Sequence, residues 1–481
     1  MKRFAPAMVA VSAAVAACTA GGGAGSAVSG VVSRGKAIEV PGLAALNNGG
    51  GAKVLAVSCA SAGNCAAAGH YTDGRHHQRG FVADERHGRW GPAIAVSGLA
   101  ALSGAYSADV VSVSCGSAGN CAAGGNYTQL PNIVVPIIVT ERGGRWGKAV
   151  ALPGDSQPGD GEVNSISCTF TGNCLAGGGI AGNNEYFYVG DGFVVQQQAG
   201  RWGPVRLVPG LRALEHGSDP QIVGSYIDSV ACPSAGNCAA GGDYTNRCMC
   251  NHAFVAAERN GVWGTAIDVP GLAALNTGGN AQVLSVSCAL AGSCAAGGYY
   301  ASRDHSIQGF VVVERNGVWG TATEVPGLAA LNTGGNAQVL SVSCALAGSC
   351  AAGGYYTGGS RHRQGFVAVE RNGVWRAATV VPGLAALNKG GGSAQVLTVS
   401  CAPAGSCAAG GYYTDGSRHR QGFVAVERNG VWRTAIEVPG LGALNAGGSA
   451  EVSSISCSLP GSCAIGGFYT DRSGHHQGFV I

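Results

Sequence analysis

Apolar and polar positions along the chain follow one pattern that recurs at intervals of 53 to 64 residues. In the fifth copy, four short segments rich in Val and aromatic residues occupy 281–288, 294–300, 308–317 and 318–328, with turn-forming residues between them. Segments of this length and composition, separated by turns, are typical of β-strands. The pattern therefore predicts four antiparallel strands in each copy, here named a, b, c and d.

The turn between strands c and d is specified by its sequence. Asn316-Gly317 is a preferred dipeptide for a two-residue hairpin, because both central residues of such a turn adopt positive φ. The same dipeptide recurs in the fourth, sixth and seventh copies. Pro326-Gly327 is expected to end strand d, since proline cannot donate to a continuing strand ladder.

A pair of cysteines separated by five residues marks the a–b turn of every copy. The eight pairs are Cys59/Cys65, Cys115/Cys121, Cys168/Cys174, Cys232/Cys238, Cys288/Cys294, Cys344/Cys350, Cys401/Cys407 and Cys457/Cys463. This spacing places the two cysteines opposite each other across a hairpin turn, which suits a disulfide. Metal binding and thiol redox chemistry fit less well. The spacing is not C-x2-C, and neighbouring copies are expected to hold their cysteine pairs far apart. The pairs predict structural disulfides.

Eight four-stranded repeats predict an all-β fold, an eight-bladed β-propeller. The phase of the repeat supports a closed ring. Seven tryptophans each open a strand d, but the eighth copy stops at Ile481 before its own strand d. Residues 35–42 match the second half of a strand d that has no preceding a, b or c. The N-terminal strand is therefore expected to complete the last blade. The rival arrangement is two separate four-repeat bodies.

Composition agrees with such a fold and excludes other classes. Hydrophobic residues make up 46% of the 481 residues and charged residues 11%, which is unlike a charge-rich disordered chain. Aromatic residues are only 7%, whereas Gly reaches 83, so the core must be built from small residues. A net charge of +3 gives no general argument for nucleic-acid binding, and no nucleic-acid partner is predicted.

The first residues predict export. A positive start at Lys2-Arg3 and an apolar run up to residue 17 suit a signal peptide, residues 1–17. The run ends at Val15-Ala16-Ala17-Cys18, which resembles a bacterial lipobox with Cys18 as the lipid-bearing residue. Residues 18–34 would be the lipid anchor and a flexible Gly/Ser tether, and residues 35–481 the propeller. This predicts a lipoprotein on the outer face of the membrane, attached through its lipid alone. Ordinary cleavage that releases a secreted protein is the alternative.

Three further residues lie together in the fourth b–c loop. Cys248, Cys250 and His252 combine two thiols and an imidazole within five residues, a set that can bind a soft metal such as copper or zinc. The alternative is a local disulfide that staples the loop. Beyond this metal, the sequence identifies no cofactor.

The b–c loops carry most of the distinctive side chains, and eight of the 11 histidines fall in equivalent loops. In a propeller, these loops and the d–a loops emerge on one face, where ligands usually bind. Tyr, Arg and His can stack on sugar rings and bind hydroxyls or carboxylates. The predicted ligand-binding residues are His76, His77, His305, Tyr356, Arg361, His362, Tyr413, Arg418, His419, His475 and His476. Duplication of a plain solvated loop is the alternative.

Motifs for catalysis are missing from the sequence. There is no G-x-S-x-G elbow, H-E-x-x-H or Walker loop. Glu258, Glu314, Glu370 and Glu427 fall at c–d hairpins, on the face opposite the His loops, and are expected to be solvated turn residues. Asp73, Asp304, Asp415 and Asp471 lie on the loop face, but one carboxylate per blade does not define an acid–base pair.

The repeated V-S-C-x5-C-A-x-G followed by N-G-x-W resembles the Cys-hairpin repeats of secreted actinobacterial proteins, whose functions are mostly unassigned. The resemblance covers nearly all of the chain after residue 34. The sequence therefore favours an extracellular binding or scaffolding module whose b–c loop face engages a glycan or an envelope protein at the cell surface. The alternative is a polysaccharide hydrolase or lyase that uses His and Tyr of that face.

Overall fold

The structure is a computed structural model. It describes residues 35–99, 105–129, 133–152, 161–181, 190–198, 200–215, 224–246, 250–389, 391–403 and 405–481. All described residues belong to one compact unit. The predicted signal peptide, Cys18 and the tether lie outside the described residues. No helix in the described part of the chain has the length and apolarity needed to cross a membrane.

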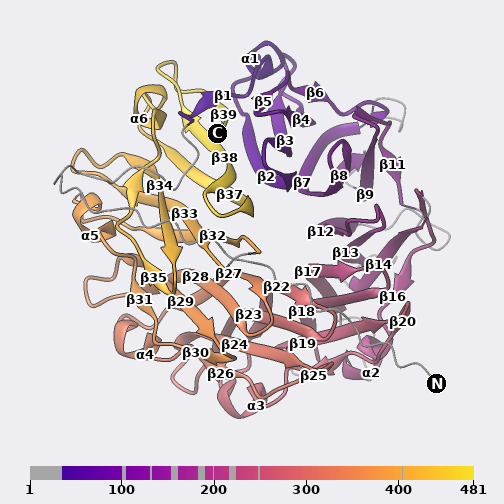
Figure 1. Ribbon diagram of the computed structural model, residues 1–481, viewed down its shortest axis with the longest axis vertical. Coiled ribbons are helices and arrows are strands. Elements are labelled where there is room, and N and C mark those ends of the chain that lie inside the picture. Colours follow the sequence, from indigo (N-terminus) through magenta and orange to yellow (C-terminus); the bar gives the residue numbers. More distant parts are fainter. Residues whose placement is uncertain are drawn as a thin grey trace, which may run out of the picture. The chain divides into compact units, whose positions relative to one another are not determined.

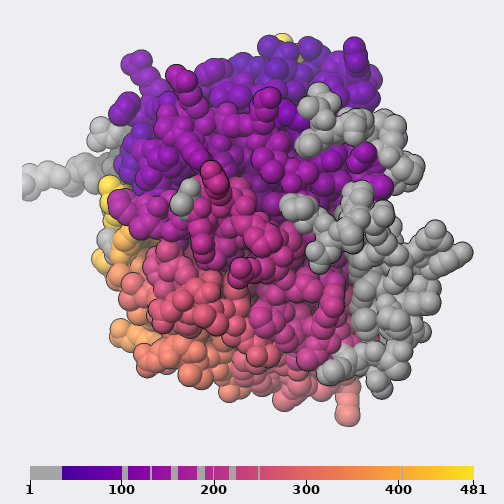
Figure 2. Space-filling model, turned by 90° about the vertical axis from the view of Figure 1, so that its right-hand side faces the viewer, coloured from indigo at the N-terminus to yellow at the C-terminus, as the bar shows by residue number. Residues whose placement is uncertain are grey.

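Eight antiparallel sheets form a ring, so the propeller prediction is confirmed (Figure 1). In each sheet the strand order is a-b-c-d. Successive blades lie beside one another, and in the side view of Figure 2 they occupy successive bands of the surface. Strand β2 (Lys53–Ser61) of the first blade packs on β37 (Ala450–Leu459) of the last, which excludes two separate four-repeat bodies.

The first two strands of the blades are long. The a strands are β2 (Lys53–Ser61), β7 (Ala105–Ser117), β12 (Gly161–Cys168), β17 (Gly224–Ser234), β22 (Ala281–Leu290), β27 (Ala337–Leu346), β32 (Gln395–Cys401) and β37 (Ala450–Leu459). The b strands are β3 (Asn64–Thr72), β8 (Asn120–Gln129), β13 (Cys174–Ala181), β18 (Asn237–Thr245), β23 (Ser293–Ala301), β28 (Ser349–Thr357), β33 (Cys407–Thr414) and β38 (Ser462–Thr470).

Strand d differs from the prediction because it is split into two short pieces that pair with the two ends of strand c. The c strands are β4 (Gln78–Arg86), β9 (Ile133–Arg142), β14 (Gly190–Gln198), β19 (Asn251–Arg259), β24 (Ile307–Arg315), β29 (Arg363–Arg371), β34 (Arg420–Arg428) and β39 (His476–Val480). The first pieces of d are β5 (Arg89–Trp90), β10 (Arg145–Trp146), β15 (Arg201–Trp202), β20 (Val262–Trp263), β25 (Val318–Trp319), β30 (Val374–Trp375) and β35 (Val431–Trp432). The second pieces are β6 (Ile94–Ala95), β11 (Val150–Ala151), β16 (Arg206–Leu207), β21 (Ile267–Asp268), β26 (Thr323–Glu324), β31 (Thr379–Val380), β36 (Ile436–Glu437) and β1 (Ile38–Glu39).

The N-terminal strand closes the ring as predicted. In β1, Ile38 pairs with Val480 and Glu39 with Phe479 of β39. This register matches that of the first blade, where Ala95 pairs with Phe81. The last blade thus takes its outer strand from the opposite end of the chain.

Short helices in the d–a loops were not anticipated from the sequence. They are α1 (Leu43–Leu46), α2 (Leu211–Glu215), α3 (Leu272–Leu275), α4 (Leu328–Leu331), α5 (Leu384–Leu387) and α6 (Leu441–Leu444). Gly327 before α4 has φ 74°, a left-handed conformation that glycine adopts without steric cost. The turn drives Leu328 into the core, where it is fully buried.

The predicted hairpin turns and disulfides are both present. Asn316 and Gly317 have φ of 50° and 81°, as a two-residue turn with positive φ requires. Each a–b turn carries its disulfide, so all eight predicted pairs are bonded. Such bonds form and persist in oxidising compartments, which agrees with export.

The disulfides lie deeper in the molecule than their position at a hairpin turn suggests. The second cysteine of each pair, near the start of strand b, is buried in every blade, and these cysteines are Cys65, Cys121, Cys174, Cys238, Cys294, Cys350, Cys407 and Cys463. All of them except Cys65 belong to the apolar clusters between blades, as Cys294 does in a cluster with Val286 and Trp319. The pairs are therefore core residues as well as staples, and they present no thiol to a ligand.

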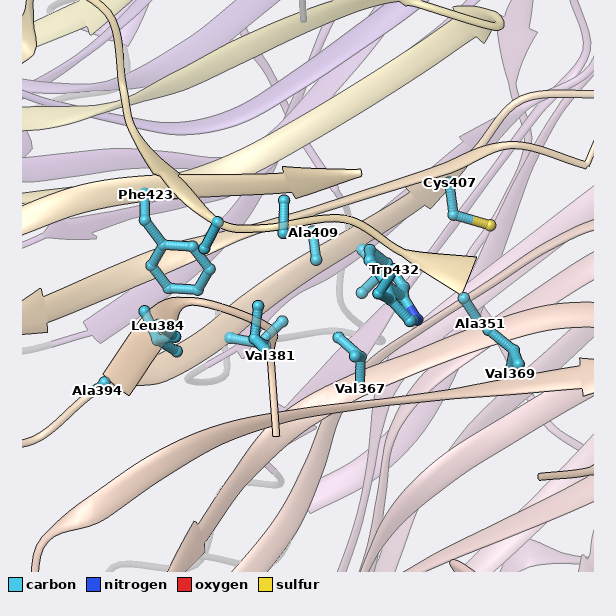
Figure 3. Close-up of a cluster of buried hydrophobic side chains, with 14 of the residues drawn as sticks. Ala351, Val367, Val369, Val381, Leu384, Ala394, Cys407, Ala409, Phe423 and Trp432 are labelled. Atoms are coloured by element: carbon cyan, nitrogen blue, oxygen red, sulfur yellow. The ribbon is translucent and has the colours of Figure 1, made fainter. Parts of the chain in front are cut away.

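The core lies between blades and is built from small and branched side chains. In the cluster between the sixth and seventh blades, Phe423, Leu384 and Trp432 pack with Val and Ala side chains (Figure 3). The Gly-Gly pair of strand b allows the close approach of neighbours. A Cβ on Gly353 would lie 2.5 Å from Val396 of the next blade, and one on Gly354 would lie 1.9 Å from the Gln338 carbonyl oxygen. The small-residue composition therefore follows from contacts between strands and between blades.

A ring of hydroxyl groups, here called the serine ring, joins the a strands of neighbouring blades. Ser287 Oγ accepts a hydrogen bond from the Cys344 N–H of the next blade at 3.0 Å, and Ser285 Oγ accepts one from Val342 at 3.0 Å. Fourteen such bonds run around the ring. Ala56 and Ala231 stand at the two positions without one. The repeated S-V-S-C motif therefore supplies the hydroxyl groups that hydrogen-bond neighbouring blades to one another.

The glutamates of the c–d hairpins were expected to be solvated turn residues, and this expectation is wrong. Glu258, Glu314, Glu370 and Glu427 are at most 1% exposed, not solvated. They face the preceding blade. At several interfaces an arginine of that preceding blade forms an ion pair with the glutamate. Arg371 Nη2 lies 2.5 Å from Glu427 Oε1, and Arg259 pairs in the same way with Glu314. The E-R-N-G repeat therefore encodes an ion pair between blades as well as a turn, and buried charges persist only when paired in this way.

Candidate functional site

An aspartate closes the b–c loop in the first, seventh and eighth blades, and this fixes the shape of the loop. Asp415 Oδ1 accepts hydrogen bonds from the N–H groups of Ser417 and His419 at 2.8 and 2.9 Å. Although partial burial opposes it, the bonds from His419, Gln421 and Ser417 hold the pKa of Asp415 below its usual value. Asp73 and Asp471 are bound in the same way. These aspartates are turn residues and remain ionised, so they are poorly suited to donate a proton at neutral pH.

A buried asparagine after the short helix ties the loop face together. Asn332 Nδ2 donates to the Ile307 carbonyl oxygen and to Gln308 Oε1 of the preceding blade, both at 2.9 Å. Its Oδ1 accepts from the N–H groups of Asn336 and Thr357 at 2.8 and 3.3 Å. We call this group the asparagine clamp. Its members are Asn47, Asn276, Asn332, Asn388 and Asn445. The clamp fixes each of these d–a loops against its neighbours.

The structure places most of the predicted ligand-binding residues on this face. The exposed ones are His76, His305, Arg361, His362, Arg418, His419 and His475, and His77 and His476 are half-buried. His475 lies over the d–a loop of the first blade, where a Cβ on Gly50 would come within 2.5 Å of its ring. His419 packs against Gly448 in the same way. These two rings therefore sit in the gaps between blades.

Tyr356 and Tyr413 are in the interior instead. They are 7% and 3% exposed and belong to the apolar clusters shared with the preceding blade. Tyr413 Oη donates to Glu437 Oε2 at 3.2 Å, and burial together with that carboxylate raises the pKa of Tyr413. Side chains so enclosed have no access to a ligand on the face. Tyr413 therefore does not meet His419 and His362 there, and the predicted residues assemble no acid–base pair.

A layer of cross-strand pairs, here called the polar belt, lies just beneath the loops. It joins the start of strand a to the end of strand b in every blade. The pairs are Lys53–His70, Asp109–Asn126, Glu162–Gly179, Tyr226–Asp243, Gln282–Tyr299, Gln338–Tyr355, Gln395–Tyr412 and Glu451–Phe468. The pairs also touch between blades, because His70 Nδ1 lies 2.9 Å from Asp109 Oδ1 of the next blade. The belt is a nearly continuous polar and aromatic ring.

Over the last three blades and the first, cations stack on aromatic rings of the polar belt, and Glu451 in this part pairs with Arg420. The guanidinium of Arg363 lies over the Tyr355 ring at 4.3 Å, and that of Arg420 over the Tyr412 ring at 3.5 Å. Lys53 Nζ lies 4.3 Å from the Phe468 ring. Attraction between a cation and the face of an aromatic ring holds such side chains in place. Arg363 and Arg420 were not among the predicted ligand residues, although they follow the predicted histidines directly.

Carboxylates occupy the other side of the belt. Asp243 of the belt and Asp228, which lies at the bulge of the neighbouring strand, are in the fourth blade, and Asp228 Oδ2 accepts from Gln282 Nε2 of the fifth blade at 2.9 Å. Burial, the Asp243 carboxylate and Glu162 raise the pKa of Asp228 to about 7. Burial raises the pKa of Asp243 to about 6. This half of the belt therefore changes charge near neutral pH.

The structure describes only part of the predicted metal site. Cys250 is disulfide-bonded, and a disulfide sulfur is not the thiolate that a soft metal binds. Cys248 lies outside the described residues. His252 stacks on Tyr244, and its Nε2 is 2.9 Å from Asn246 Nδ2. Within the described ranges, no three His, Cys, Asp or Glu residues gather closely enough to hold a metal ion. The arrangement favours the alternative of a disulfide, and the metal site stays a prediction.

Comparisons with known proteins supply no family. No protein-family model and no curated protein matches the chain. Among solved structures, a polysaccharide lyase of family PL25, an ulvan lyase, has a TM-score of 0.40 at 8% identity over 90% of this chain and 94% of its own. The fucose-specific lectin from Aleuria aurantia has a TM-score of 0.32 at 10% identity over 67% and 92%. The Hadza microbial sialidase Hz136 has 0.37 at 10% identity over 72% and 73%. Likenesses this distant carry no argument about function, and the resemblance to Cys-hairpin repeat proteins stays a prediction.

Proposed function

We propose that this protein is an extracellular binding module that recognises an acidic glycan through the b–c loop face of its sixth, seventh and eighth blades. The observation that carries the proposal is the pair of stacked arginines, Arg363 and Arg420, in neighbouring blades. Stacking fixes the guanidinium plane and leaves N–H groups on its edge, although Nη2 of Arg420 already pairs with the Glu451 carboxylate of the eighth blade. Such groups bind carboxylates and sulfates in a bidentate manner.

The loop tips add cations that no acidic side chain neutralises. Arg361 and Arg418 are exposed at equivalent positions, with φ of 62° and 66°. In the described part of the chain, no carboxylate lies within ion-pairing distance of Arg361, Arg363 or Arg418. The nearby carboxylate of Asp415 is engaged in its own loop, as described above. Unpaired cations at regular spacing suit a polymer that carries a negative charge on successive sugars.

The face is also held rigid, which lowers the entropic cost of binding. Besides the asparagine clamp, backbone hydrogen bonds link c strands to the next d–a loop. The Arg420 N–H donates to the Gly448 carbonyl oxygen at 3.0 Å, and the His476 N–H to that of Gly50 at 2.9 Å. The platform is therefore preformed between blades rather than assembled from mobile loops.

Calorimetric titration of the full chain tests this proposal. Polygalacturonate, a polymer of uronic acids, should bind, whereas neutral dextran of the same length should not. A variant with Arg361→Asn and Arg418→Asn should bind at least tenfold more weakly, since it loses two charge-assisted contacts. Asn is chosen because it tolerates positive φ.

The control for that titration removes two charges from the opposite face. Arg89 and Arg145 are exposed at the c–d turns, and a variant with Arg89→Ala and Arg145→Ala should bind polygalacturonate as the unmodified protein does. Equal loss of affinity in both double variants would mean that net charge, not this face, attracts the polymer. Equal binding of dextran would also refute the proposal.

Export and lipid attachment at Cys18 belong to the same proposal. The eight disulfides support export, because such bonds are rare in reducing compartments. Mass spectrometry of the N-terminal peptide from the protein made in a bacterial host would detect a diacylglyceryl group on Cys18. A Cys18→Ala variant should then leave the membrane fraction, and an unmodified N-terminal peptide would contradict lipid attachment.

A further inference from the structure

A cavity of about 260 Å³ lies between the first and second blades, at the a–b and c–d end, opposite the proposed glycan face. Its wall includes Asn64, Asp84 and Arg86 from the first blade and Ser117 and Glu141 from the second. Its volume exceeds the roughly 30 Å³ share of one water molecule several times over, so a small organic molecule has room there.

Comparison with another interface shows that the repeat does not require this cavity. At the equivalent place between the seventh and eighth blades, the cavity measures only about 10 Å³. There Val426 stands where the first blade has Asp84, and Leu459 stands where the second blade has Ser117. Two apolar side chains that fill the gap at that interface are thus replaced by smaller or polar ones. Blade packing alone therefore does not explain why the larger cavity is kept.

Besides Glu85, the cavity wall holds two carboxyl groups, those of Asp84 and Glu141, and both contact the one arginine. Arg86 Nη2 lies 3.0 Å from Asp84 Oδ2 and 3.2 Å from Glu141 Oε1, whereas at two other interfaces the arginine pairs with one glutamate across the gap. Trp146 Nε1 donates to Asp84 Oδ1 at 2.8 Å. Glu141 is 2% exposed. One positive charge therefore faces two carboxyl groups in a partly dehydrated space.

A proton on Glu141 offsets the excess negative charge of the two carboxyl groups. Burial, followed by the charge of Asp84, raises the pKa of Glu141 to about 7, despite the opposing effect of Arg86. The other titratable groups of the wall are Glu85 and His87 of the first blade. The wall from the second blade adds none besides Glu141. A cation that entered the cavity would take the place of that proton.

We propose that this cavity binds a small organic cation through a primary ammonium group. The ammonium N–H groups would donate to Asp84 and Glu141, and the alkyl chain would fill the remaining volume. On binding, the proton of Glu141 leaves to solvent, so charge is conserved at the site. A metal ion fits less well, because Arg86 already engages an oxygen of each carboxyl group. The site is independent of the proposed glycan face.

Calorimetric titration of the full chain with 1,5-diaminopentane tests the proposal. We expect saturable binding of one molecule per chain and release of protons near pH 7, seen as a dependence of the heat on the ionisation enthalpy of the buffer. Uncharged 1,5-pentanediol, which has the same length, should not bind. Calcium chloride should neither bind at this site nor displace the diamine.

Two variants restore the residues of the small cavity. Asp84→Val removes the second carboxylate, and Ser117→Leu fills the space, so each should weaken diamine binding at least tenfold. Ser234→Leu makes the same change at an equivalent turn of the fourth blade and should leave binding unchanged. Thermal melting shows whether each variant folds. If Asp84→Val does not fold, Ser117→Leu serves as the test. The proposal is overturned if the diamine does not bind, if the diol or calcium binds equally well, or if the folded variants bind the diamine normally.

Discussion

Replacing Asn47 by Ala should open the seam at which the first and last blades meet. Asn47 Nδ2 donates to the His476 carbonyl oxygen at 2.8 Å and to Gln477 Oε1 at 3.0 Å. Its Oδ1 accepts from the N–H groups of Gly51 and Thr72 at 2.9 and 3.2 Å. Each such bond contributes about 1 kcal/mol net, and buried partners left unpaired cost more. The variant should therefore lose about 4 kcal/mol of unfolding free energy.

Differential scanning calorimetry measures the effect. Unfolding entropy is about 2 cal/mol/K per residue, so a folding unit that spans residues 31–481 changes its melting temperature by about 1 °C per kcal/mol. Asn47→Ala should thus melt about 4 °C lower than the unmodified protein. Asn48→Ala is the matched control, because its side chain is exposed and makes one long bond, 3.4 Å to the Ala45 carbonyl oxygen. If the two variants melt within about 1 °C of each other, the asparagine clamp does not hold the seam.

Three other changes test the interblade contacts, the disulfides and the acidic half of the belt. Ser287→Ala should lower the unfolding free energy measured in urea by about 1 kcal/mol, and Ala231→Ser should raise it by a similar amount. Changes of the opposite sign would contradict the role of the serine ring. Replacing Cys344 and Cys350 together by Ala should cost about 2 kcal/mol, whereas an unchanged urea midpoint would refute a stabilising disulfide. The pKa of Asp228 is raised to about 7 in the folded protein, so its ionisation destabilises the fold above that pH and the penalty disappears below about pH 4. Asp228→Asn should therefore raise the unfolding free energy by up to about 4 kcal/mol at about pH 8 and not at about pH 4, and a gain that is the same at both values would contradict this pKa.

The sequence predicted the ring because its signals are local and repeated eight times. The Cys pairs mark the a–b hairpins, Asn-Gly marks the c–d turns, and the phase of the repeat assigns 35–42 to the last blade. The structure confirms all three. Each signal acts within one hairpin or through strand pairing, so no knowledge of the contacts between blades is needed to interpret it.

Contacts between blades could not be predicted in the same way. Glu427 looks like a hairpin residue in the sequence, but its partner Arg371 lies 56 residues earlier in the neighbouring blade. The role of Asn332 also depends on atoms of the preceding blade. Strand alternation offered one missed signal. In a Tyr-Tyr pair at the end of strand b, the two side chains point to opposite faces, so both could not join the same surface.

The most direct test of the proposed glycan face is to locate the bound polymer. Hydrogen–deuterium exchange of the full chain should be measured with and without a saturating concentration of polygalacturonate. The b–c loops at 358–363 and 415–420 should exchange more slowly with the polymer, and the c–d hairpins at 315–318 and 428–431 should not change. Protection confined to the hairpins, or no protection of the loops at saturation, would contradict binding at the b–c loop face.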